Sequence, residues 1–430
     1  MSMSKKQVLI SRTEISDLND DLLKAILFRL PLKSLHISKC VSKKWNDVSS
    51  KAPLRKPIGT PAGLFYCDLD GQGWGYTSSI AGEEYEDDPM ANFDPSLSFL
   101  PCHPQQLLIS ACNGLLLCLE NGDHWLNFLV CNPVTKTWAS VPMPESVGGA
   151  ITHFAALDYD PNVSPHFRII RFMHRCEGGL VNSEVLHINH FFGEQLIRDP
   201  WHFNPPKEMD IEVFSSETGR WVKSTILHGA RVSCSWLQSL TLNGVLYKLA
   251  NPRYLLRYDL KENGVPLAEI QLPDDAGCAT YGCLGLSEGS LHFAHCDVFA
   301  LKIWQLRNSN GGGVWHLKHA IPYDNLRELA VLDLGSEWGK ISHRPAGFLS
   351  DYEIAFLEGN GVVAYDYKLF RIRRLSSLKP YSVTTGQFKN FTFSPCLHDP
   401  ARVLKPSSGT IKLSNDDESE VLTTLLLFSD

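Results

Sequence analysis

A short pattern of strand, polar turn and aromatic residue recurs along this chain and constrains its fold more than any other feature. Residues 130–138 contain a β-type run, an Asn-Pro turn and a Trp, and residues 213–221 repeat the pattern with Glu-Thr-Gly as the turn. Such a unit is typical of a hairpin whose aromatic residue packs back onto the sheet. Looser copies occur at 258–264, 303–315 and 365–370.

The spacing of these copies predicts a ring of blades. Trp138 and Trp221 are 83 residues apart, close to two of the ~40 to 50-residue units typical of propeller blades. Each blade has an apolar face that only its neighbours can cover, so the copies are expected to close on themselves. We expect about five or six units between residues 63 and 400. Helical periodicity vanishes after Pro61, which predicts an overwhelmingly β large domain.

The N-terminal segment has the opposite character. Between residues 16 and 45, large apolar side chains recur at steps of three to five, which places them on one stripe of a helix. Asn19 can cap the first helix, and Pro31 excludes helical geometry at Leu30. About 35 residues cannot bury so many apolar side chains among themselves. The surplus apolar face needs a partner, either the rest of this chain or another polypeptide.

Several spacings in this segment resemble the F-box motif, whose pattern runs Leu-Pro, Leu, Ile-Leu, Arg-Leu-Pro, Leu, then Val-x-Lys-x-Trp. The matching stretches are 17–23, 26–31, Leu35 and 40–45, and Asn19 stands where the family usually has Pro. The resemblance implies binding to the Skp-type adaptor of an SCF ubiquitin ligase and, through it, to the cullin scaffold. The contact residues that it implies are Leu18, Leu22, Ile26, Leu27, Leu30, Pro31, Leu35, Val41 and Trp45.

Residues 114–117, 130–138 and 141–142 resemble the opening of the plant F-box-associated domain, a relative of kelch-type propellers. The implied fold is mainly β: a kelch-like β-propeller-type F-box-associated domain preceded by a small all-α F-box domain. In that family the second domain selects the protein to be ubiquitinated, and here the target is unknown. The expected order is a flexible N-terminus (1–13), the F-box (14–56), a linker with the strands that enter the propeller (57–106), the propeller-like domain (107–400), and a C-terminal tail or closing strand (401–430).

No catalytic, metal-binding or cofactor-binding pattern accompanies these motifs. The densest His group, His187, His190 and His202, lacks the spacing of a zinc site, and no Gly-x-Ser-x-Gly elbow is present. We therefore expect a non-catalytic chain without a cofactor. Two alternatives stay open: a kelch-like propeller enzyme or small-ligand binder, and a propeller scaffold that acts outside any ligase.

Charge and composition restrict the partners further. A net charge of -7 has the wrong sign for a nucleic acid or an anionic membrane. No segment approaches the ~18 apolar residues of a membrane helix, and residues 8–10 are too few for a signal-peptide core. The 12 Cys form no C-x-x-C pair, which favours reduced thiols. We expect the protein in the cytoplasm, the nucleus or both.

Overall fold

The strands form six antiparallel sheets, each of which is one blade of a propeller. In the computed structural model of this chain, the described residues are 18–27, 37–50, 63–67, 74–78, 93, 96–101, 107–119, 127–144, 155–161, 163–174, 208–227, 238–250, 253–260, 268–273, 282–297, 299–309, 312–335, 345–358, 361–376, 390–393, 396, 398–404 and 412–413.

Each blade is numbered by its place along the chain. Blade 1 contains β3 (Leu107–Cys112), β4 (Leu115–Leu119), β5 (Asn127–Asn132), β6 (Thr137–Pro142) and a short fifth strand, β24 (Lys412–Leu413). Blade 2 contains β7 (Ala155–Asp158), β8 (Arg168–His174), β9 (Glu208–Ser215) and β10 (Arg220–Leu227). Blade 3 contains β11 (Ser239–Leu242), β12 (Val245–Ala250), β13 (Tyr254–Asp259) and β14 (Ala268–Gln271).

The remaining blades follow the same order, except the last. Blade 4 contains β15 (Gly282–Ser287), β16 (Ser290–Cys296), β17 (Ala300–Ser309) and β18 (Gly312–Pro322). Blade 5 contains β19 (Pro345–Ser350), β20 (Glu353–Glu358), β21 (Gly361–Asp366) and β22 (Arg371–Ser376). Blade 6 combines β23 (Asn390–Phe393) with β1 (Gly63–Cys67) and β2 (Trp74–Ser78).

The ring closes because a late strand pairs with an early one. The inner strands contact one another in the cyclic order β3, β7, β11, β15, β19, β23 and back to β3. In blade 6, β23 pairs with β1 from Gly63↔Phe393 to Tyr66↔Asn390. The predicted β-propeller is confirmed, with six blades. Residues 401–430, expected to form a tail or closing strand, contribute β24 at the outer edge of blade 1, whereas β23 closes the ring.

The sequence of β4 shows why blades need neighbours on both sides. Leu115, Leu117 and Leu119 are fully buried in one core with β7, whereas Leu116 and Cys118 are buried in another core with β1 and β23. Because alternate strand residues point to opposite faces, a run that is apolar at every position fits only a strand covered on both faces.

Tight turns connect the first two strands of several blades. These turns have two residues, both with positive φ, as the type I′ hairpins that match strand twist require. Glycine occupies the second position in each, and the next strand begins directly after it. The pairs are Asn113 (φ 45) with Gly114 (φ 90), Asn243 (φ 54) with Gly244 (φ 78), and Glu288 (φ 49) with Gly289 (φ 69).

The repeated tryptophans connect one blade to the preceding one. Trp221 in β10 donates its indole N–H to the carbonyl of Pro142 in β6, at 3.0 Å. Trp315 in β18 donates in the same way to Gln271 in β14, also at 3.0 Å. The expectation that the Trp after each turn packs into the β structure is therefore confirmed, and the contact extends across blades.

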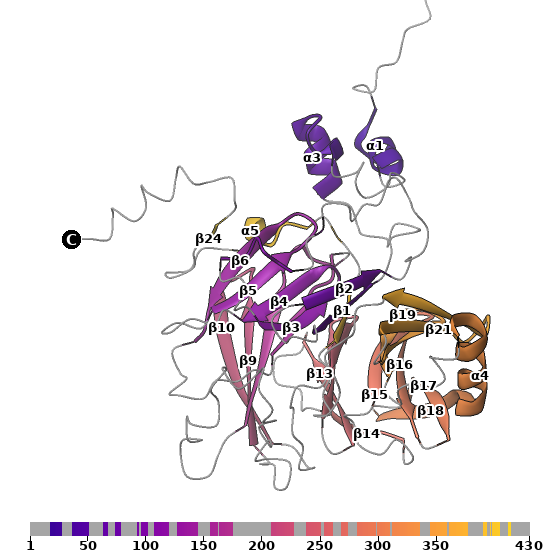
Figure 1. The fold of residues 1–430 in the computed structure, drawn as a ribbon. Helices are drawn as coiled ribbons and strands as arrows, with labels where there is room; N and C mark the ends of the chain where they lie inside the picture. The colour runs from indigo at the N-terminus through magenta and orange to yellow at the C-terminus, as the bar shows by residue number, and fades with distance from the viewer. Residues whose placement is uncertain are drawn as a thin grey trace, which may run out of the picture.

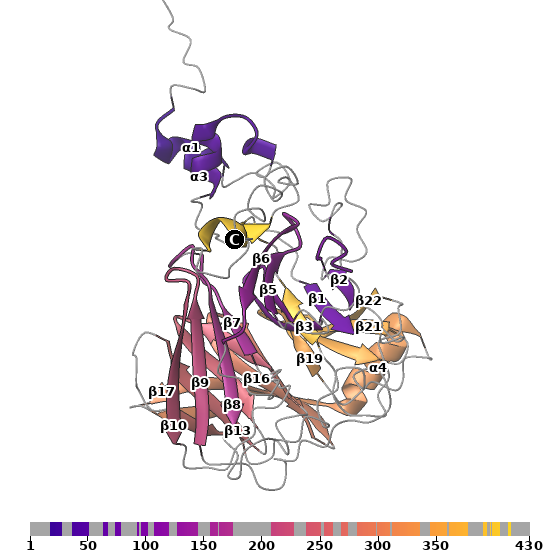
Figure 2. The same ribbon diagram turned by 90° about the vertical axis from the view of Figure 1, so that its left-hand side faces the viewer.

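Helices accompany the ring in the described part of the chain. The F-box helices α1 (Asp20–Leu27) and α3 (Lys43–Ser50) lie outside it, near blade 1 (Figures 1 and 2). Helix α4 (Tyr323–Leu334) packs against β18 and β22, and α5 (Pro400–Val403) packs against β5 and β6. The expected overwhelmingly β domain after Pro61 is confirmed, and α4 is its longest helical exception, with buried Tyr323, Leu326 and Ala330 on one helical face. No helix among the described residues has the length and apolarity needed to cross a membrane.

Candidate functional site

The first F-box helix begins with the cap that its sequence suggests. The Asn19 side chain accepts a hydrogen bond from the Leu22 N–H at 2.8 Å, and the Asn19 carbonyl accepts from Leu23 at 3.0 Å. A side-chain oxygen at this position pairs one of the four unpartnered N–H groups of a helix start. The replacement of the usual Pro by Asn therefore leaves the helix start intact.

Polar contacts hold α1 against α3. The Lys44 ammonium donates to the Leu18 carbonyl at 2.7 Å and lies 3.6 Å from the Asp20 carboxylate. Ser42 caps α3 by accepting from the Trp45 N–H at 3.1 Å. The two Lys44 contacts join the start of α1 to α3 without using apolar surface.

The F-box has a small core of its own. Leu23, Leu27 and Val48 are at most 4% exposed, and Trp45 packs against them. Val134, in the turn between β5 and β6, packs against the same cluster and so joins the F-box to blade 1. Leu23 and Leu27 are four residues apart and therefore share one face of α1.

Four other large apolar side chains of this segment lie outside its core. Leu22 is 54% exposed, Ile26 48%, Ile37 57% and Val41 61%. We call these four residues the F-box apolar surface. Large apolar side chains this exposed within one short helical segment indicate an interaction site rather than a monomer surface.

The predicted contact residues fall into three groups in the structure. Leu22, Ile26 and Val41 are exposed, whereas Leu18 and Trp45 are half-buried and Leu27 is fully buried in the F-box core. Leu30, Pro31 and Leu35 lie outside the described residues. Ile37 was absent from the predicted set, although its apolar side chain lies on the face shared with Leu35 and Val41 in the sequence pattern.

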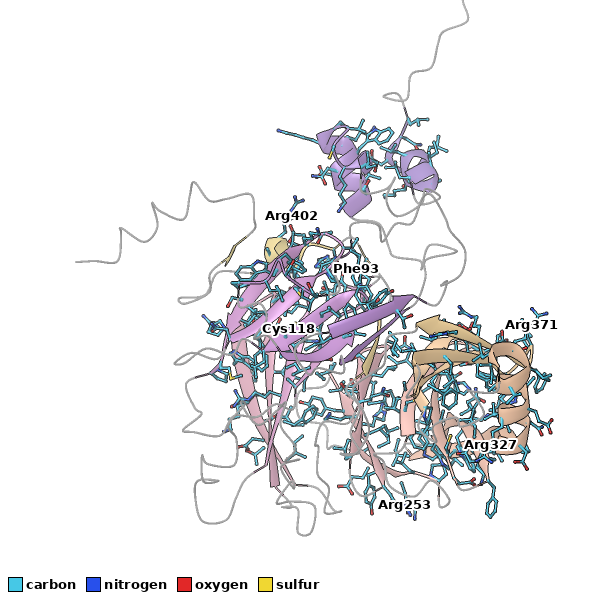
Figure 3. All side chains as sticks on the ribbon, in the orientation of Figure 1. Phe93, Cys118, Arg253, Arg327, Arg371 and Arg402 are labelled. Carbon is cyan, nitrogen blue, oxygen red and sulfur yellow. The ribbon has the colours of Figure 1, made fainter. Side chains whose placement is uncertain are left out.

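The junction between the F-box and the ring contains several charged groups. Burial, together with the nearby Arg402, lowers the pKa of Lys39, whereas Asp399 raises it. Figure 3 shows Arg402 on the ring side of this junction. The His398 ring stacks near Tyr159, with centroids 4.7 Å apart, and burial lowers the His398 pKa to about 4. The junction therefore includes packed, partly desolvated groups from both parts of the chain.

The described residues show no arrangement typical of a metal site. No cluster of three or more His, Cys, Asp or Glu side chains suited to a metal ion occurs among them, and seven of their cysteines form no disulfide bond. The candidate group of His187, His190 and His202 lies outside the described residues.

Two family models match this chain. Residues 15–57 match the F-box domain, and residues 97–331 match the model described as "F-box protein At3g26010-like, beta-propeller". The chain belongs to this family of F-box proteins. The second match covers blades 1 to 4 of this F-box protein in full or in large part, and the structure adds blades 5 and 6.

Individual relatives come from Arabidopsis thaliana. F-box protein At1g30790 is 28% identical over 183 residues, which are 39% of this chain and 44% of that protein. F-box protein At3g26010 is 24% identical over 318 residues, 71% of this chain and 69% of that protein. F-box/kelch-repeat protein At3g61590 is 26% identical over 238 residues, 54% of this chain and 50% of that protein. The chain spans about half the length of the first and third of these relatives.

Proposed function

We propose that this F-box protein is the substrate-recognition adaptor of an SCF-type E3 ubiquitin ligase and performs no catalysis itself. The F-box would bind the Skp-type adaptor and, through it, cullin, and the propeller would bind a target protein. The observation that carries the proposal is the F-box apolar surface, because Leu22, Ile26, Ile37 and Val41 are exposed and take no part in the described F-box core. The proposed location is the cytoplasm, the nucleus or both. The propeller is proposed to be related to kelch-type propellers.

Helix-in-groove burial supplies the binding energy in this proposal. Paired residues four apart on α1, such as Leu22 and Ile26, are the usual anchors of an amphipathic helix in an apolar groove. Each central anchor commonly contributes about 2 kcal/mol or more. The chain then acts by raising the effective concentration of the target near the ligase.

Co-purification with a recombinant plant Skp-type adaptor tests this assignment. Leu22→Asp and Ile26→Asp should each weaken binding by roughly 30-fold or more, because each places a carboxylate where an apolar contact is required. Val222→Asp is the matched control, since Val222 is a 63% exposed apolar residue on the propeller. Circular dichroism should show that all three variants fold, because none of the replaced side chains is buried.

The result that overturns the proposal is equally direct. Undiminished adaptor binding by Leu22→Asp and Ile26→Asp would remove the F-box apolar surface as the docking site. Recovery of the adaptor without cullin would instead favour a scaffold role outside the ligase.

A further inference from the structure

Among the residues that the structure describes, one turn conformation occurs three times at the same end of the propeller. It connects the third and fourth strands of blades 1, 2 and 5, so all three copies lie at the end where Val134 contacts the F-box. In each copy a side chain of the first residue accepts a hydrogen bond from the N–H two residues later. These bonds are Val134 N to Asn132 Oδ1 at 2.9 Å, Glu217 N to Ser215 Oγ at 3.3 Å, and Lys368 N to Asp366 Oδ1 at 2.9 Å.

The fifth position of this turn is left-handed in every copy. Lys136 has a φ of 55°, Gly219 of 69° and Phe370 of 53°. Glycine adopts this conformation without a steric cost, and a bulky aromatic residue is an outlier in it. Phe370 is 60% exposed and the preceding Leu369 is 64% exposed. Burial of the Phe370 side chain therefore does not offset the cost of its strained backbone. An exposed, strained aromatic residue indicates a role in binding rather than in folding.

The end of α4 adds to this apolar tip. The Ile372 N–H donates to the Asp333 carboxylate at 3.0 Å, which brings the last turn of α4 beside the β21–β22 turn. Val331 is 42% exposed and Leu332 is 79% exposed on that last turn. We call Leu369, Phe370, Val331 and Leu332 the blade 5 tip. Figure 3 shows the neighbouring Arg371 at the outer edge of the ring, beside α4.

Basic side chains surround the blade 5 tip. Lys368 and Arg371 are exposed on the turn and at the start of β22, and the Lys368 ammonium lies 4.2 Å from the centre of the Tyr352 ring. The nearby carboxylates accept hydrogen bonds: Asp366 from the Lys368 and Leu369 N–H groups, Asp333 from the Ile372 N–H, and Glu288, close to Lys368, from the Tyr352 hydroxyl. Glu353 is held by a two-pronged bond from Arg373, at 2.8 and 2.9 Å. Two exposed cations, Lys368 and Arg371, on a chain of net charge -7 make this edge complementary to acidic groups.

We infer that the blade 5 tip docks a segment of the target protein in which Leu or Phe side chains stand beside Asp or Glu. The apolar side chains would cover Leu369 and Phe370, and the carboxylates would pair with Lys368 and Arg371. The inference rests on the proposed function for its biological role. It is tested separately because the F-box apolar surface and the blade 5 tip share no residue.

Selection from a phage-displayed library of random peptides tests the docking site without knowledge of the target. The full chain and its Phe370→Gly variant serve as baits, and selected peptides are then measured by fluorescence anisotropy. Phe370→Gly cannot fail to fold for steric reasons, because glycine suits the left-handed position. Lys136→Gly, at the equivalent position of blade 1, is the matched control.

The expected result has three parts. Peptides selected by the wild-type chain should be rich in Leu or Phe together with Asp or Glu, and should bind Phe370→Gly about tenfold more weakly or worse. Lys136→Gly should bind them as the wild type does. Phe370→Gly should still bind the Skp-type adaptor, whereas Leu22→Asp should lose the adaptor and retain the peptides.

Three outcomes would overturn the inference. The first is a selection in which no peptide depends on Phe370, and the second is one in which the dependent peptides are basic. The third is a wild-type dimer in solution that Phe370→Gly converts to a monomer, since the occupant of the tip would then be a second copy of this chain. Failure of adaptor binding alone would contradict the proposed function and leave this site standing.

Discussion

Leu22 and Leu23 are neighbours in α1 with opposite environments. Leu23 is 1% exposed in the F-box core, and Leu22 is 54% exposed on the F-box apolar surface. Their partners four residues later, Leu27 and Ile26, repeat the contrast. The apolar face of α1 is therefore wider than the F-box core. Leu23 and Leu27 hold the F-box together, whereas Leu22 and Ile26 are exposed and can contact another molecule.

Alanine at these two positions should separate stability from binding. Leu23→Ala should destabilise the F-box by about 2 to 5 kcal/mol, because it removes a buried side chain and leaves a cavity. Leu22→Ala should change stability by less than about 0.5 kcal/mol, as is usual for an exposed position. Native-state amide hydrogen exchange of residues 18–27 measures both. Equal losses in the two variants would contradict the assigned environments.

Replacing Phe370 is expected to increase stability, in contrast to Leu23→Ala. Phe370→Gly should stabilise the chain by up to about 1 kcal/mol, because the left-handed conformation costs most residues roughly 1–2 kcal/mol and the greater unfolded-state freedom of glycine offsets part of the gain. Lys136→Gly should behave alike, since Lys136 has nearly the same φ. Thermal unfolding of both variants provides the measurement. A loss of stability confined to Phe370→Gly would show that Phe370 serves the fold.

At the scale of elements, the sequence predicted local structure better than long-range pairing. The hairpins at 130–138 and 213–221 form as β5–β6 and β9–β10, because a turn and its flanking strands are encoded together. The pairing of β1 with β23 has no local signal, since the two strands lie more than 300 residues apart. The sequence did not predict helix α4. Its exposed Val331 and Leu332 interrupt the helical periodicity of the buried Leu326 and Ala330.

The contact residues of the F-box apolar surface were predictable from the sequence only in part. Motif spacing identified Leu22, Ile26 and Val41 as candidate contact residues, and all three are exposed. Which of two adjacent apolar residues points into the core depends on how α1 packs against α3. The sequence therefore could not show that Leu27 is buried and Ile26 exposed. The blade 5 tip left no signal in the sequence, because an exposed Leu-Phe pair in a turn resembles a strand end.

The junction segment around His398 should make stability depend on pH. Burial holds the His398 pKa at about 4, below the ordinary 6.5. Between these values the unfolded chain binds a proton that the folded chain excludes, so stability is full above pH 6.5 and falls as the pH falls towards 4. From pH 7 to pH 5 the expected loss is about 2 kcal/mol.

A variant isolates this contribution from other titrating groups. His398→Phe keeps an aromatic ring near Tyr159 and removes the titrating nitrogen, so its stability should fall less between pH 7 and pH 5. His316→Phe, at an exposed position of β18, should retain the wild-type dependence. The measurement is the urea midpoint of the three proteins at both pH values. Equal losses of stability in all three would contradict the role assigned to His398.

At the scale of the whole molecule, closure of the ring joins the two halves of the chain. Contacts between blades, such as Trp221 to blade 1 and Trp315 to blade 3, are repeated around it. The Gln238 side chain crosses more than one boundary, because it donates to the Ala346 carbonyl and accepts from the Leu284 N–H, both at 2.9 Å. Each blade therefore depends on the presence of the next.

Truncation at the closing strand should reveal this dependence. A chain that ends before Asn390 loses β23, which leaves β1 unpaired on one edge and exposes the apolar cores around Phe65 and Leu64. We expect it to aggregate, since an open edge and an uncovered apolar face both favour association. A chain that ends after Leu404 keeps β23 and should remain monomeric. Size-exclusion chromatography distinguishes the two, and a monomeric shorter chain would contradict the account.

Amide hydrogen exchange of the full chain, with and without a plant Skp-type adaptor, tests most directly whether the F-box apolar surface is covered by another polypeptide. Slower exchange in residues 18–27 and 37–50 on adding the adaptor, with the six blades unchanged, is the predicted result. Unchanged exchange in those two ranges, or slowing confined to the blades, would contradict it.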